Sequence, residues 1–423
     1  MNRIISLLSI FFICLSVQAQ DNPEMEAAAF SVPEEWDANW DKLVNSWFVK
    51  HYTAKINHEG YQNHKLADDA TYSKRLSKLP NVIELPYNNI VRKSIEQYIN
   101  RRPFVEYLLA IEPVYFPMIE EILDKYGLPL ELKYLTIVES ALNPTARSRR
   151  GASGLWQFMM ATGKSYGLEI NSLIDERLDP VKSTVAACRY LKDLYDIYGE
   201  WSLVIAAYNC GAGNVNKAIR RANGKTDFWK IYGFLPRETR AYVPLFIAAN
   251  YMMNYYAYHQ LYPAQMETPS ATDTVMINQR MHFDQISTIL NIDKEELRAL
   301  NPQYKKDVIP GNGKPYVLKL PSQMACAFAE KENDIANYNI EGLFTGHITV
   351  ENVKQQMMKG KTSMKNEKQI ASNETVQYKV LAGESYYTIA KKFPGYDPTD
   401  LMRLNNTRSS ALRKGQYIRV PKI

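Results

Sequence analysis

Glu139 is the residue of this sequence whose type and surroundings best suit proton transfer. It lies near the end of an apolar segment patterned as a helix, residues 130–142, which Asn143-Pro144 ends because a residue before proline disfavours helical backbone. An apolar setting and the partly negative end of a helix both favour the protonated carboxylic acid. Such an acid can donate a proton to the oxygen of a glycosidic bond. Taken alone, a glutamate on a helix is more often a surface residue.

Four short motifs in a fixed order distinguish Glu139 from an ordinary surface glutamate. They are Glu139-Ser140, Gly154-Leu155-Trp156-Gln157, Ala206-Ala207-Tyr208-Asn209-Cys210-Gly211 and Thr239-Arg240-Ala241-Tyr242-Val243-Pro244. In this order and spacing they resemble the lysozyme-like lytic transglycosylases, specifically the membrane-bound murein transglycosylase D type, over roughly residues 90–260. The sequence departs from the usual pattern at Trp156, where many relatives have Met, and at Cys210, where Ala is commoner.

The resemblance implies a role for each matching residue. Glu139 would be the general acid and then the general base. Ser140 would orient the substrate's acetamido group or the glutamate, and Tyr242 would close the cleft beside it. The substrate-binding residues implied in this way are Ser140, Gln157, Tyr208, Asn209 and Tyr242. Each has a structural alternative: a helix-end hydroxyl for Ser140, a turn cap for Gln157, and core packing for the two tyrosines.

The reaction type depends on the number of carboxylates at the cleft. A glycosidase normally needs two across the scissile bond, but the next acidic residue after Glu139 is Glu169, and Glu131 or Asp175 would have to fold in from a distance. With one carboxylate the substrate supplies its own nucleophile. The resemblance implies that the C6 hydroxyl of N-acetylmuramic acid (MurNAc) attacks its own anomeric carbon. The β-1,4 bond to N-acetylglucosamine (GlcNAc) would then break and leave a 1,6-anhydroMurNAc end.

Two other functions stay open at this point. A peptidoglycan hydrolase (muramidase) on the same fold would use water and a well-placed second carboxylate. A non-catalytic wall-binding scaffold would be expected to lack the acid, whereas Glu139 and all four motifs are present. The resemblance implies no organic cofactor and no metal, and no Cys/His cluster has metal-ligand spacing.

The C-terminal residues carry a second recognisable pattern. Residues 376–422 contain Tyr378-Lys379-Val380, Gly383-Glu384-Ser385, Leu404-Asn405, Gly415-Gln416 and Val420-Pro421, which resemble a LysM domain. Such domains bind GlcNAc-containing glycans between the first strand–helix loop and the second helix–strand loop. The glycan-binding residues implied are Gly383, Glu384, Ser385, Asn405 and Asn406. Residues 274–321 share the strand–helix–helix–strand layout but lack the opening Gly-Glu-Ser loop, so glycan binding there is doubtful.

These patterns predict a mainly α protein, with a lysozyme-like α-helical catalytic domain followed by small α+β (βααβ) LysM modules. The expected boundaries are a signal peptide at 1–19, an N-terminal helical and irregular segment at 20–88, a transglycosylase domain at 89–265, a degenerate LysM-like unit at 266–322, a linker at 323–375 and a LysM domain at 376–423.

Composition and charge indicate where the protein works. The first 19 residues read as a signal peptide, too short to span a bilayer, so the expected product is exported and without a transmembrane helix. A monomer is expected, and the oligomeric state is left open. Whether Cys14 is lipidated, and whether Cys188 and Cys210 form a disulfide, stays open. From Thr375 onward nine basic residues face three acidic ones, which suits the carboxylates of a cell wall. Export argues against nucleic acid. The expected partner is peptidoglycan, in the periplasm, and an outer-membrane association is left open.

Overall fold

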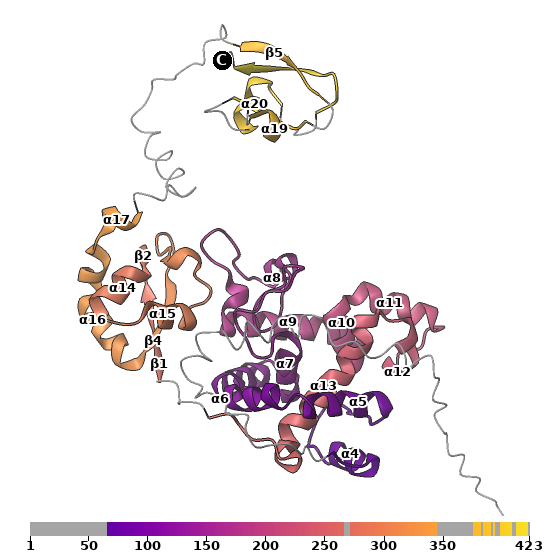
Figure 1. Ribbon diagram of the computed structural model, residues 1–423. Helices are drawn as coiled ribbons and strands as arrows, with labels where there is room; N and C mark the ends of the chain where they lie inside the picture. The colour runs from indigo at the N-terminus through magenta and orange to yellow at the C-terminus, as the bar shows by residue number, and fades with distance from the viewer. Residues whose placement is uncertain are drawn as a thin grey trace, which may run out of the picture. The chain divides into compact units, whose positions relative to one another are not determined.

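The structure is a computed structural model that describes residues 66–265, 271–344 and most of 375–421, except 382–383, 391, 394–397 and 408–411. The chain divides into two compact units, Met1–Ile340 and Glu341–Ile423, which are treated separately below (Figure 1). The expected signal peptide and most of the expected N-terminal segment lie outside the described residues. None of the described helices is long and apolar enough to cross a membrane.

The first part of unit 1 is helical throughout. Its elements are α4 (Asp69–Leu76), α5 (Asn89–Ile99), α6 (Arg102–Lys125), η1 (Leu130–Tyr134), α7 (Leu135–Ser140), α8 (Met160–Ser165), η2 (Glu176–Leu178), α9 (Pro180–Tyr198), α10 (Trp201–Cys210), α11 (Ala212–Arg221), α12 (Phe228–Ile231), η3 (Tyr232–Phe234), α13 (Arg237–Tyr255) and η4 (Tyr256–His259).

Capping residues and backbone conformation account for where helices α9 and α7 begin and end. Helix α9 starts where the Asp179 carboxylate accepts from the backbone N–H groups of Val181 and Lys182, with Pro180 in the first turn. It ends at Gly199, which adopts the left-handed conformation. The predicted helix at 130–142 is instead a 3-10 turn followed by the short α7, because Ala141 and Leu142 both have positive φ.

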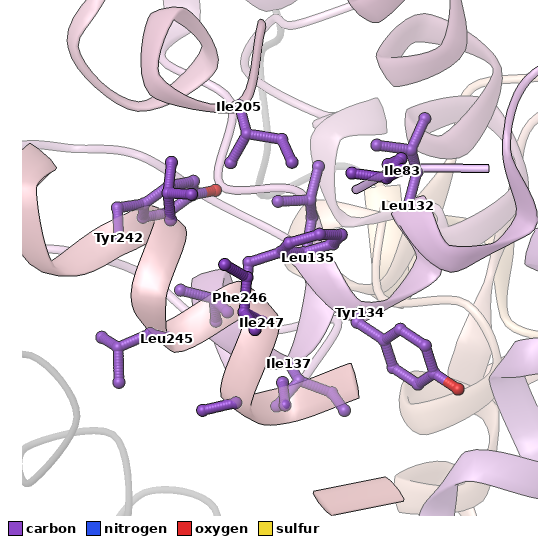
Figure 2. Close-up of a cluster of buried hydrophobic side chains, with 14 of the residues drawn as sticks. Ile83, Leu132, Tyr134, Leu135, Ile137, Ile205, Tyr242, Leu245, Phe246 and Ile247 are labelled. Carbon is purple, nitrogen blue, oxygen red and sulfur yellow. The ribbon is translucent and has the colours of Figure 1, made fainter. Parts of the chain in front are cut away.

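Helix α7 lies against α13 in the hydrophobic core. Figure 2 shows side chains from the two elements in one cluster, with Leu135 and Ile137 from α7 beside Phe246 and Ile247 from α13. All four side chains are almost entirely buried. Burying a side chain of this size contributes about 1.5–3 kcal/mol, so the position of the α7 backbone, which carries Glu139, is held by the core.

The second part of unit 1 is a small α+β module of short strands and helices. It consists of β1 (Thr272–Ile277), β2 (Met281–His282), α14 (Phe283–Leu290), α15 (Lys294–Leu300), η5 (Lys305–Asp307), β3 (Val308–Ile309), β4 (Tyr316–Pro321), α16 (Ser322–Asn337) and α17 (Ile340–Phe344). Strands β1 and β4 pair antiparallel, from Thr272 opposite Pro321 to Ile277 opposite Tyr316.

The expectation of a linker from residue 323 is wrong for the segment up to 344. Helix α16 packs on β1, β4 and α14, and it buries Phe328 and Ile335 on one face. The Gln285 amide donates hydrogen bonds to the carbonyl oxygens of Ala336 and Tyr338, which fixes the end of the helix. The rest of the expected linker, from 345 to 374, lies outside the described residues.

Unit 2 contains the same strand–helix–helix–strand order. Its described elements are β5 (Thr375–Lys379), α19 (Tyr386–Ala390), α20 (Pro398–Leu404) and β6 (Tyr417–Pro421), with β5 and β6 antiparallel. In both modules one asparagine ties the second helix to the last strand. The Asn405 amide donates to the carbonyls of Leu401 and Arg419 and accepts from the Arg419 N–H; Asn301 makes the corresponding three bonds in the first module.

Candidate active site

Glu139 and Tyr242 meet between α7 and α13. The Tyr242 hydroxyl donates a hydrogen bond to Glu139 Oε1, and the Tyr242 side chain is buried. Burial first, and then the charge of Glu139, hold the pKa of Tyr242 well above its ordinary value, so the hydroxyl keeps its proton and remains a donor. Glu139 itself is partly exposed. The predicted contact between the glutamate and the tyrosine is therefore present in the structure.

Ser140 faces the protein interior. Its side chain is buried, and its hydroxyl lies 3.0 Å from the carbonyl oxygen of Thr136 and 2.9 Å from that of Leu155. These bonds tie the end of α7 to the loop that carries Gly154-Leu155-Trp156-Gln157. The geometry is that of the helix-end alternative, and it fixes the backbone next to Glu139.

The loop after Ser140 depends on a glycine. Gly154 has φ +87°, and a Cβ atom there would lie 1.7 Å from the carbonyl oxygen of Arg177. Gln157 also has positive φ, and its side-chain amide donates to the carbonyls of Ala146, at 3.2 Å, and Gly154, at 2.8 Å. Trp156 is fully buried and donates to Thr184 Oγ1. Gln157 and Trp156 thus shape the loop, and Gln157 remains partly exposed.

Helix α10 contributes Tyr208 and Asn209. The Tyr208 hydroxyl donates to the Trp156 carbonyl at 2.8 Å, and burial followed by the charge of Glu139 raises the pKa of Tyr208. The Tyr208 hydroxyl therefore lies close enough to Glu139 to respond to the charge of that carboxylate. Asn209 is exposed, and its Oδ1 accepts from the Thr239 hydroxyl of α13 at 2.8 Å. The motifs predicted to act together thus converge around Glu139 from α7, α10, α13 and the 154–157 loop.

The two distant carboxylates that could have made a hydrolase are engaged elsewhere. Glu131 is buried and its Oε1 accepts from the backbone N–H of Ile83 at 2.7 Å. Asp175 is buried and accepts from Arg177 Nε and Nη2, at 2.8 and 2.9 Å. Burial opposes the charge of Asp175, but the bonds and charge of Arg177 outweigh it, so the pKa of Asp175 lies below its ordinary value.

Arg177 is a supporting residue that the sequence did not reveal. Its Nη1 donates to the carbonyl oxygens of Gly151, at 2.8 Å, and Phe158, at 3.0 Å, on either side of the 154–157 loop. Its side chain is 5% exposed and that of Asp175 is 1% exposed. An aspartate and an arginine two residues apart look like a surface pair in the sequence, and only the fold shows them buried beneath the motif loop.

Three models of known families match the chain. The Transglycosylase SLT domain matches residues 117–231, the lytic transglycosylase MltD LysM-like domain matches residues 271–337, and the LysM domain matches residues 378–421. Over 342 residues the chain is 31% identical to the membrane-bound lytic murein transglycosylase D of Escherichia coli strain K12, covering 79% of this chain and 70% of that protein. The chain belongs to the membrane-bound lytic murein transglycosylase D family.

Other similarities are shorter. The soluble lytic murein transglycosylase of Escherichia coli strain K12 is 32% identical over 124 residues, covering 28% of this chain and 19% of that protein. Among solved structures, the 70-kDa soluble lytic transglycosylase of Escherichia coli matches with 23% identity and a TM-score of 0.31, over 42% of this chain and 32% of that chain.

Membership of the transglycosylase D family confirms the predicted family and enzyme class: the chain is a peptidoglycan lytic transglycosylase. The described elements confirm a mainly α fold with small strand–helix modules. No group of His, Cys, Asp and Glu among the described residues could hold a metal ion, and Cys188, Cys210 and Cys326 are all free thiols.

The LysM-like module of this transglycosylase docks on the helical domain. It contacts residues 169–177, which we call the docking loop. The backbone N–H of Asp175 donates to the Gln303 carbonyl at 2.9 Å, and the N–H of Lys305 donates to the Leu173 carbonyl at 2.7 Å. Glu169 accepts from Lys314 Nζ and from the Tyr316 hydroxyl. The docking loop therefore links the module to Arg177 and the active-site loop.

The residues carried over to the glycan groove of the LysM domain are only partly exposed for binding. Glu384 accepts from Lys392 Nζ, the Leu381 N–H and the Tyr378 hydroxyl, and the Lys392 bond first and the Leu381 bond second lower the pKa of Glu384. The Ser385 hydroxyl accepts from the Thr388 N–H at 3.3 Å, at the start of α19.

The second loop of the groove divides in the same way. Asn405 is committed to the helix–strand tie described above, whereas Asn406 is exposed with positive φ. Gly383 lies outside the described residues.

Proposed function

We propose that the enzyme cleaves the MurNAc–GlcNAc β-1,4 bond of peptidoglycan and forms 1,6-anhydroMurNAc ends. The observation that carries this proposal is that, among the described residues, Glu139 lies where the motifs meet, whereas the two alternative carboxylates are bound elsewhere. Glu139 accepts a hydrogen bond from buried Tyr242, while Glu131 and Asp175 are held by other partners. A mechanism that needs only one carboxylate therefore fits the described residues better than one that needs two.

The proposed step conserves protons. Glu139, in its acid form, transfers its proton to the leaving O4 of GlcNAc as the glycosidic bond breaks, and positive charge develops at the MurNAc anomeric carbon. The C6 hydroxyl of the same MurNAc attacks that carbon, and the Glu139 carboxylate accepts the hydroxyl proton. The Tyr242 bond stabilises the ionised form between the two transfers.

Digestion of purified peptidoglycan tests the proposal. The mature wild-type protein and Glu139→Gln are incubated with sacculi, and the released muropeptides are weighed by mass spectrometry. Anhydro ends, lighter by one water than hydrolysis products and missing with Glu139→Gln, are expected. Reducing ends would contradict the proposal and favour a muramidase. Binding without release by the wild type would favour a scaffold.

The LysM domain is proposed to hold the enzyme on its substrate. A second binding module raises the local concentration of glycan near the cleft, which favours repeated cleavage of one polymer. The corresponding location is the periplasm, against the wall, after removal of residues 1–19. Removing residues 376–423 should weaken co-sedimentation with sacculi while leaving cleavage of short soluble oligosaccharides unchanged. Equal sedimentation of the two forms would contradict the tether.

A further inference from the structure

A basic pocket of about 400 Å³ lies beside the active site and has no part in the proposed step. It is bounded by α11, η3 and the start of α13, and its cationic residues are Lys217, Arg221 and Arg240. None of its lining residues, all within the described helical domain, is acidic. Phe234 adds an exposed aromatic face.

The cations of this pocket differ in how firmly they are placed. Arg240 is fixed, because its Nε donates to the Leu235 carbonyl at 2.9 Å and its Nη2 donates to the Gly233 carbonyl at 2.8 Å. Lys217 and Arg221 lie one turn apart on α11, are exposed, and form no ion pair with the residues that the structure describes. Like charges at this spacing repel each other on a helix, and a bound anion would relieve that repulsion.

The nearest acidic residue on α13 does not neutralise the pocket. Glu238 lies two residues from Arg240, but its carboxylate faces Arg150 on the 147–153 loop, at 3.3 Å. The pocket therefore presents a net positive charge to solvent.

Two lining residues of the pocket lie close to Asn209, a proposed substrate contact. Asn214, in its lining, donates to the carbonyl of Cys210 at 2.8 Å, and Cys210 directly follows Asn209. On the other wall Arg240 follows Thr239, whose hydroxyl donates to Asn209. A substrate group that extends from a sugar bound at Asn209 could therefore reach Lys217, Arg221 and Arg240.

We propose that this pocket binds a carboxylate of the peptide stem carried by the muramic acid, an inference that rests on the proposed function. While the stem is attached, the lactyl carboxyl of the muramic acid is tied up in an amide bond, so the negative charge of the strand lies on the stem peptide, which ends in a carboxylate. An extended peptide spans about 3.3–3.6 Å per residue, so a stem of a few residues is long enough to leave the cleft and enter the neighbouring pocket. The pocket makes the enzyme prefer glycan that carries stems.

The test compares two substrates and two charge-matched variants of the full-length mature protein. Lys217→Gln/Arg221→Gln removes two charges from the pocket. Arg220→Gln/Lys225→Gln removes two exposed charges from the same region outside its lining. The substrates are soluble glycan oligosaccharides with their stems and the same oligosaccharides after an amidase has removed the stems.

We expect the pocket variant to lose roughly three- to tenfold in kcat/KM on stem-bearing glycan, a modest loss because exposed ion pairs contribute little. The loss should appear mostly in KM, because the pocket binds the substrate away from the reacting bond. On stripped glycan it should match the wild type, and the control variant should match on both. Equal losses on both substrates, or no loss on either, would overturn the pocket assignment while wild-type cleavage leaves the proposed function intact. Absence of cleavage by the wild type would instead refute the proposed function.

Discussion

The buried pair of Asp175 and Arg177 offers the sharpest test of how the active-site loop is held. Replacing Asp175 by Asn keeps the shape of the side chain but removes its charge, and it leaves the Arg177 guanidinium buried without a counter-charge. With 5% and 1% of the two side chains exposed, solvent cannot replace the lost partner. Breaking a buried ion pair from one side costs about 3–5 kcal/mol, and we expect Asp175→Asn to lie near the lower end because the amide oxygen still accepts one bond.

The loss should be visible in both stability and turnover. For a domain of this size, about 3 kcal/mol corresponds to a fall of roughly 6–12 °C in the unfolding temperature. Arg177 also holds the carbonyls of Gly151 and Phe158. A loop displaced by about 1 Å can lower turnover by about 100-fold, so kcat on peptidoglycan should fall by about 10- to 100-fold at temperatures where the variant is still folded.

The sign of the pH dependence follows from the lowered pKa of Asp175. A carboxyl whose folded-state pKa is depressed stabilises the fold above its unfolded pKa of about 3.9 and loses that contribution as the pH falls through its folded-state pKa. The stability difference between wild type and Asp175→Asn should therefore be constant above about pH 5 and shrink below about pH 4.

Thermal unfolding followed by circular dichroism, together with turnover assays, measures these effects. Arg92→Gln serves as the control, because Arg92 pairs with Glu96 and Asp69 at the surface with 42% of its side chain exposed, and its loss should cost less than about 1 kcal/mol. If Asp175→Asn unfolds within the same margin as Arg92→Gln, the pair is not a support of the loop and the reasoning is refuted.

Three further predictions concern other parts of the chain. Gly154→Ala should unfold the domain or abolish expression of soluble protein, because the added Cβ would overlap a backbone carbonyl. Gly151 has the same φ of +87° with open space around it, so Gly151→Ala should lower the free energy of unfolding in urea titrations by only about 1–2 kcal/mol. Tyr242→Phe should shift the alkaline limb of the pH–rate profile to higher pH, since the Glu139 carboxylate loses a donor and the general acid keeps its proton to higher pH, and an unchanged profile would contradict that role. Asn405→Ala should lower the free energy of unfolding of the LysM domain by about 2–3 kcal/mol, because three hydrogen bonds are lost. In calorimetry only the melting temperature of this domain should fall, and cleavage of soluble oligosaccharides should stay unchanged.

Much of the fold could be predicted because its signals are local. Helix α9, for example, begins and ends where the sequence places capping residues, Asp179 and Gly199. Helix α16 was missed because its exposed face, rich in Glu, Lys and Asn, outweighs the few apolar residues that it buries. Its partners β1 and α14 are distant in the sequence, so no local pattern indicates these contacts.

The site was predictable in part for the same reason. The motifs fix which residues come together around Glu139, and Tyr242 contacts it as the resemblance implied. The direction in which each side chain points is a property of the backbone, however. Ser140 and Gln157 turn toward backbone carbonyls because the short α7 ends in left-handed residues and the loop after it folds back on itself.

The two strand–helix modules share one layout but differ in what their residues contact. Both keep an asparagine, Asn301 or Asn405, that ties the second helix to the last strand, so this residue belongs to the fold rather than to glycan recognition. The first module lacks the Gly-Glu-Ser loop, and its Lys305 and Tyr316 bind the docking loop. Because that loop continues into Arg177, the first module supports the catalytic domain.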